Sequence, residues 1–203
     1  MKLWSRRSRV SRAGADRSRR DRGAALIEFA LVAPIFFFVV FSGIEVGLMA
    51  RSFLSLQDAG RTAARTAAVE RSDVNADLAI AEVIDARLSS LTGELQRVVV
   101  YNAASLSSVI DDVNMGLCVD ATFSSTPGQC TVYSSAALDS LIDAGPLTAD
   151  SAPTGGGYLP SQRSEGNFIG IYVEYDHRSV TGFFDTMTLR SDTVQVIEAD
   201  LGG

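Results

Sequence analysis

The longest apolar run of the chain lies near its N-terminus and covers residues 24–50, interrupted by Glu28 and Glu45. No residue from 29 to 44 is charged. As an α-helix the run would be about 40 Å long, enough to cross roughly 30 Å of hydrocarbon. A buried helix of a soluble protein is the alternative, but residues 35–41 are apolar on every face, unlike an amphipathic core helix. The pattern therefore predicts a transmembrane helix over residues 24–50.

After the apolar run the periodicity changes to that of packed helices. Residues 51–69 favour helix, with Gly60 as the main exception. They carry a face of small residues, Ala59, Ala63, Ala64, Ala67 and Ala68. We expect this face to pack against the chain's own sheet rather than against neighbouring chains. Apolar residues then recur at steps of three and four from Val74 to Leu91, which predicts a second helix. Residues 51–92 are thus predicted to be helical.

The pattern changes again after Gly93, where short strands are predicted. These strands cover residues 97–102, 117–123, 131–134 and 168–175, with one or two more over 187–189 and 193–197. A short helix is expected over 136–142, and the Gly- and Pro-rich residues 145–166 are expected to form a mobile loop. The chain is therefore predicted to be α+β, with a long N-terminal helix followed by a small, mainly antiparallel sheet domain over residues 93–203.

Charge is divided unevenly between two parts of the chain. The first 22 residues hold nine Lys and Arg against Asp16 and Asp21, a net +7, whereas the remainder holds nine Arg against 22 acidic residues, a net −13. Membrane proteins keep Lys- and Arg-rich flanks in the cytoplasm. We therefore expect a cytoplasmic leader over residues 1–23 and an extracytoplasmic body. Nucleic-acid binding explains the basic arm less well, because Trp4 is its only aromatic residue and no motif reads bases.

Other export signals fit the N-terminus poorly. An ordinary secretory signal has a shorter apolar region and an A-x-A-like cleavage site. The residues after Ile44 are Glu-Val-Gly-Leu-Met-Ala-Arg, which offer no convincing site. A twin-arginine signal is also disfavoured, because Arg19-Arg20-Asp21 is followed by another Arg and not by an apolar pair.

Glu28 is the residue that a simple membrane anchor does not need. A carboxylate costs about 2.5–3.5 kcal/mol at the centre of a bilayer, and less near the interface. If the chain is cut after Gly23, Ala24 becomes the amino terminus and Glu28 the fifth mature residue. Amine and carboxylate would then lie one helical turn apart or meet between neighbouring subunits. Such pairing lowers the free energy needed to bury either charge.

The sequence here resembles prepilins of the type IV class, in which a short basic leader ends in Gly and the fifth mature residue is Glu. Over about residues 22–70 it resembles the TadE-like pseudopilins (TadE, TadF and TadG relatives) of the tight-adherence system, also called the Tad or Flp pilus. The resemblance rests on Glu28-Phe29-Ala30-Leu31-Val32-Ala33-Pro34, Gly43-Ile44-Glu45-Val46-Gly47 and the alanine-rich residues 56–69.

The resemblance implies a specific role. A membrane-embedded prepilin peptidase would cut between Gly23 and Ala24, and Glu28 would then neutralise the amine of an adjacent subunit. Phe29 stands where the major pilin usually has Tyr, which favours a minor subunit, as does the chain length. Implied partners are other Tad pilins and pseudopilins, the inner-membrane Tad assembly platform and the lipid bilayer. The implied location is the bacterial inner membrane, with possible association with the pilus after processing.

Four further residues of the apolar run have expected roles in the helix. Pro34 should kink it. Gly43 and Gly47 lie on one face, where another helix could approach closely. Glu45 lies near the outer membrane boundary, where it would either reach to the interface or pair with another subunit in assembly.

The remaining candidate chemistry is sparse. Cys118 and Cys130 are the two cysteines, which permits one disulfide in an exported domain, with two free thiols as the alternative. His177 is the one histidine, and its spacing from the cysteines does not suit zinc. No cofactor or metal is expected.

Two other functions compete with pilus assembly. A tethered enzyme could use His177 as a base, or a cation at Asp111-Asp112, but a surface histidine and a solvated turn are the simpler interpretations. We expect no enzyme. An uncleaved, single-pass adhesin or scaffold protein is the principal alternative. The intact mass and the N-terminal sequence of the mature protein distinguish it from a processed pseudopilin.

Overall fold

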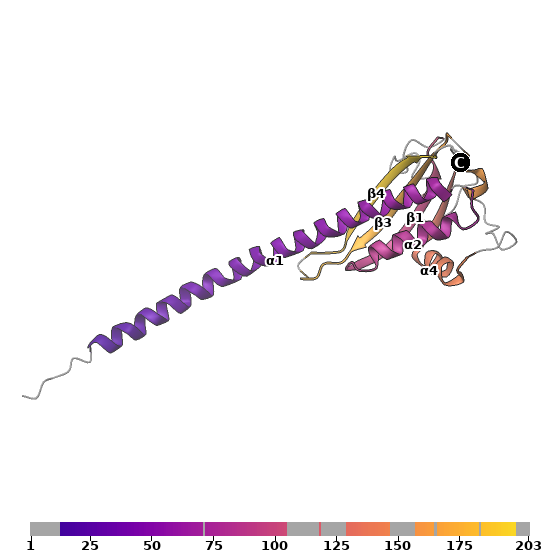
Figure 1. Cartoon of the computed structure of the whole chain (residues 1–203). Helices are drawn as coiled ribbons and strands as arrows, with labels where there is room; N and C mark the ends of the chain where they lie inside the picture. The colour runs from indigo at the N-terminus through magenta and orange to yellow at the C-terminus, as the bar shows by residue number, and fades with distance from the viewer. Residues whose placement is uncertain are drawn as a thin grey trace, which may run out of the picture. The chain divides into compact units, whose positions relative to one another are not determined.

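The computed structural model describes residues 13–70, 72–104, 118, 129–146, 157–164, 166–182 and 184–197, with side chains from residue 23 onward. Its helices are α1 (Ala13–Glu70), α2 (Ala76–Leu88), α4 (Ser135–Ala144) and the 3-10 turn η2 (Pro160–Gln162). Its strands are β1 (Gly93–Asn102), β2 (Cys130–Ser134), β3 (Phe168–His177) and β4 (Met187–Val196), shown in Figure 1. The chain divides into two compact units, residues 1–44 and 45–203.

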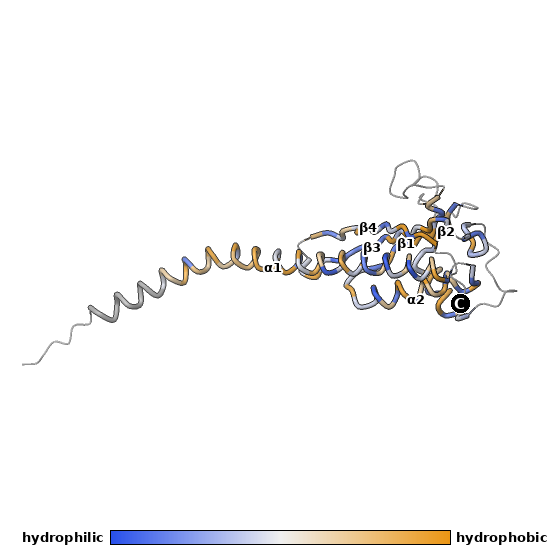
Figure 2. Tube along the Cα trace, turned by 45° about the horizontal axis from the view of Figure 1, so that its top comes forward, coloured by the Kyte–Doolittle hydropathy of each residue, from blue (hydrophilic) through white to orange (hydrophobic). Residues whose placement is uncertain are grey.

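The described part of the first unit is the N-terminal portion of α1. Its large apolar side chains are exposed, among them Leu31 and Ile35, about 70% and 69% of whose surfaces are accessible. Figure 2 shows hydrophobic residues following one another along this portion of α1. Among the described residues, α1 is the one helix long and apolar enough to cross a membrane, judged by length and composition. Helix formation runs through Pro34, which lies inside α1.

The second unit is built on a four-stranded antiparallel sheet with strand order β2-β1-β3-β4. Successive side chains of a strand point to opposite faces. In β1, Val98 and Val100 accordingly belong to one apolar cluster, whereas Val99 and Tyr101 belong to the other. The predicted α+β class, with a long first helix and a small antiparallel sheet, is confirmed.

The larger apolar cluster lies between the helices and one face of the sheet. It joins α1, α2, α4, β1 and β3, and all five alanines of the predicted small-residue face of α1 are buried in it. A Cβ added to Gly60 would lie 3.0 Å from Ser191 Oγ of β4, so the helix approaches the sheet closely at this point. The expectation that this face of α1 packs within its own chain is therefore confirmed.

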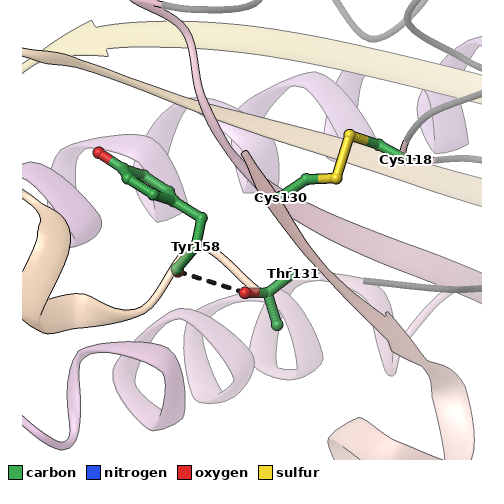
Figure 3. The surroundings of a disulfide bond; sticks show 4 residues. All are labelled: Cys118, Cys130, Thr131 and Tyr158. Atoms are coloured by element: carbon green, nitrogen blue, oxygen red, sulfur yellow. Dashed lines mark hydrogen bonds between the residues drawn. A yellow bond between two sulfur atoms is a disulfide. The ribbon is translucent and has the colours of Figure 1, made fainter. Parts of the chain in front are cut away.

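The opposite face of the sheet holds a smaller cluster of Val99, Tyr101, Cys118, Cys130 and Tyr172. Cys118 and Cys130 form a disulfide with a Cα–Cα distance of 6.0 Å (Figure 3). The Tyr101 ring lies over Gly170 of β3, where an added Cβ would come within 2.0 Å of it. The even cysteine count had allowed this bond without requiring it.

Predicted elements differ from the structure mainly in their ends. The second helix begins at Ala76 and ends at Leu88, and residues 187–196 form one continuous strand. Within the range expected to be a mobile loop, Tyr158 and Arg163 are buried on either side of η2, which the sequence did not suggest. The strand expected over 117–123 and the pair Asp111-Asp112 lie outside the described residues, apart from Cys118.

Candidate functional site

The predicted processing and assembly residues all lie on α1. Gly23, Ala24, Glu28 and Phe29 are helical and exposed. Exposure leaves each of them accessible to another molecule, and it places the Glu28 carboxylate among apolar neighbours such as Ile27 and Phe29. In an apolar environment an isolated carboxylate is unfavourable unless a positive charge compensates it.

Gly43 and Gly47 leave open space on α1. Both are exposed, and a Cβ added to either would meet no other atom within 4 Å. Residues four apart lie on the same helix face. Glycines at this spacing in a helix let a second helix pack closely.

Glu45, by contrast, is buried and has partners in its own domain. Its Oε1 accepts a hydrogen bond from the Val180 amide at 3.2 Å, and its Oε2 accepts one from the Thr181 amide at 3.1 Å. The same carboxylate lies 3.5 Å from His177 Nε2. The sequence left open an interfacial or an intersubunit environment for Glu45. In the structure Glu45 attaches α1 to the turn after β3.

His177 was expected at the surface, and this prediction is wrong. Its side chain is buried at the end of β3, and its Nδ1 lies 3.1 Å from Ser52 Oγ of α1. The ring therefore lies between Ser52 and Glu45, which are about two helical turns apart on α1. The sequence signal was absent because Ser52 and His177 are separated by 125 residues.

A second buried polar group joins α2, β2 and the residues around η2. Asp77 accepts a hydrogen bond from the Tyr133 hydroxyl at 2.6 Å and forms an ion pair with Arg163. Arg163 Nη2 also lies 3.4 Å from the Tyr158 carbonyl oxygen. Burial, together with the Asp77 carboxylate, raises the pKa of Tyr133. These contacts hold the domain together and leave the apolar part of α1 as the main candidate for function.

The comparison with protein families falls on that part of the chain. Residues 23–65 match the family model described as TadE-like protein. The N-terminal segment is therefore similar to TadE-like proteins. The match begins at Gly23, includes Glu28 and Glu45, and ends within the part of α1 that packs on the sheet. It confirms the resemblance seen in the sequence.

The match lies within α1, so it does not extend to the sheet of the second unit. A search of curated proteins and a search of solved structures gave no match to the chain. The family match and the exposed apolar helix together indicate a single-pass membrane protein.

Proposed function

We propose that this protein is a TadE-like minor pseudopilin that helps to assemble a Tad pilus. The observation that carries the proposal is the match of residues 23–65 to the TadE-like family, on a helix whose apolar side chains are exposed. A chain of this kind needs lipid or neighbouring helices to cover residues 24–44. A structural subunit that passes from the membrane into a pilus meets both environments.

Processing is the first step of the proposal. A prepilin peptidase cuts after Gly23 and creates a positive amine at Ala24. Glu28 lies four residues further on, which is about 6 Å along a helix. The carboxylate then pairs with an amine, either its own or that of an adjacent subunit. The exposure of Gly23, Ala24 and Glu28 supports this step, because both the peptidase and a neighbouring subunit need access to them.

Helix packing is the second step. Other Tad pilins or pseudopilins approach the open face at Gly43 and Gly47, where their backbones can come close. Glu45 contributes from within the subunit, because it fixes the turn after β3 to the helix. In this proposal the basic arm remains in the cytoplasm, α1 crosses the inner membrane, and the domain stands outside, where the assembly platform adds the subunit.

The test compares Glu28→Gln with Glu82→Gln, a matched change at an exposed carboxylate of α2. Each variant replaces the wild-type chain in its own cell, and the amounts in the membrane and in sheared pili are measured. Glu28→Gln is expected to reach the membrane and lose its place in assembly, seen as absence from pili or as loss of piliation. Glu82→Gln is expected to behave as wild type. Normal piliation with Glu28→Gln would overturn the role of Glu28.

A further inference from the structure

The turn between β3 and β4 exposes apolar side chains. Val180, Phe184 and Met187 are 59%, 42% and 49% exposed. Exposed Arg178 precedes them, and exposed Asp185 follows Phe184. A group of large apolar side chains flanked by charged residues is typical of a surface that meets another apolar phase.

This turn contacts α1 at Glu45. The Val180 and Thr181 amides donate to Glu45, and Ile44 is the last residue of the uncharged stretch that precedes it. Counting about 1.5 Å per residue from Ala24, a hydrocarbon core of about 30 Å ends near residue 44. If α1 spans a bilayer, the contacts of Glu45 therefore hold the turn at the outer membrane surface.

Three backbone amides of the turn have hydrogen-bond acceptors within the protein, which suits an environment with little water. Glu45 accepts from the amides of Val180 and Thr181, and Ser179 Oγ accepts from the Gly182 amide at 3.2 Å. Unsatisfied amides are costly near hydrocarbon, so these three bonds remove a barrier to contact with lipid. The Glu45 carboxylate thus satisfies the amides of the turn, a role that does not involve another subunit.

A small cleft opens beside the turn. It has a volume of about 180 Å³, and its lining includes Val46 and Met49 of α1 together with Phe184 and Met187. Within the second unit, helix and turn thus line one cleft with apolar side chains.

We propose that the described part of the β3–β4 turn, residues 178–182 and 184–186, together with Met187 at the start of β4, enters the outer interface of the lipid bilayer and forms a second membrane contact beside the transmembrane helix. The proposal rests on the membrane-anchored function proposed above. Its physical consequence is that the sheet domain is held against the membrane before assembly. Extraction of the subunit into a pilus must then remove the turn from lipid as well as the helix.

Tryptophan fluorescence in nanodiscs tests the proposal with the full chain. Trp4, the one native tryptophan, is replaced by Phe, and single tryptophans are placed by Phe184→Trp and, separately, Val180→Trp. Fluorescence is compared in ordinary and brominated phosphatidylcholine. Val39→Trp serves as the transmembrane reference. Val69→Trp, 75% exposed and about 36 Å along α1 from Glu45, serves as the reference outside the bilayer.

We expect brominated lipid to reduce the fluorescence at positions 39, 180 and 184 and to leave position 69 unchanged. Quenching at 39 alone would overturn the contact of the turn and leave the transmembrane helix in place. Loss of quenching at 39 as well would contradict the membrane anchoring itself, and the inference with it. Because two turn positions are labelled separately, misfolding of one variant does not decide the result.

Discussion

The two portions of α1 follow opposite rules for residue size. In residues 23–44 the large side chains, such as Phe36 and Ile35, are exposed. In the portion that packs on the sheet, the side chains with no exposure include Ala59, Ala63 and Ala67. The sheet lies close to this portion and favours small residues along it, with Leu56 as a larger buried side chain, whereas lipid accepts large apolar residues without that limit. One helix thus has two kinds of surface, and the size of the residues along it distinguishes the exposed apolar portion from the portion packed on the sheet.

The family match follows the same division. Residues 23–65 contain the whole exposed apolar portion and only part of the packed portion. The sheet domain is held by its own contacts, among them the buried pair of Asp77 and Arg163 and the disulfide. We therefore expect domain stability and membrane-linked function to respond to different substitutions.

The largest effect on the domain is expected from Arg163→Met. Removing one member of a buried ion pair leaves the other charge uncompensated and costs about 3–5 kcal/mol. Urea unfolding followed by circular dichroism should show this loss, while membrane association of α1 stays intact. The matched control is Arg178→Met, whose pair with Glu94 is exposed and whose loss should cost less than about 1 kcal/mol. Equal effects of the two changes would contradict the comparison.

A second pair of changes contrasts the two portions of α1 directly. Gly60→Leu forces a side chain against Ser191 and Thr193 and should lower domain stability by about 1–3 kcal/mol. A Cβ added at Gly47 meets no atom within 4 Å, so Gly47→Leu should leave stability unchanged while hindering close approach of another helix. Both variants gain helix propensity, so their difference in thermal unfolding isolates packing. A Gly47→Leu variant that unfolds as readily as Gly60→Leu would remove the distinction.

The smallest effect concerns pH and is confined to the sheet domain. Burial raises the pKa of Tyr133 and Tyr172, and neighbouring carboxylates raise them further. When folding raises the pKa of a tyrosine, its contribution to the free energy of unfolding is fully present below the pKa of the unfolded state, about 10. The contribution declines as the pH rises above that value. Unfolding free energy should therefore be flat from about pH 8 to about pH 10 and fall beyond it. Tyrosinate absorbance that follows an ordinary titration in the folded domain would contradict this.

Sequence reasoning could predict what repeats along the chain. The alanine face of α1 follows helical spacing, and Ile169, Ile171 and Val173 alternate along β3 and lie in the main apolar cluster. Periodicity of this kind needs no knowledge of distant partners. The apolar run and its first glutamate were recognisable for the same reason.

Single polar residues with distant partners were not predictable. His177 was expected to be exposed because it lies at a strand end, yet it is buried against Ser52. Asp77 and Arg163 lie 86 residues apart, and no local pattern connects them. Such contacts depend on how the helices cover the sheet, which periodicity alone does not specify.

The intact mass of the protein from native membranes, measured beside that of Gly23→Ala, tests the central claim most directly. The account predicts a wild-type chain that begins at Ala24 and a variant that keeps its leader. A wild-type chain that begins at Met1 would contradict the account and leave an anchored extracytoplasmic protein. Cleavage after Ile44 would also contradict it, because Glu28 would then be absent from the mature chain.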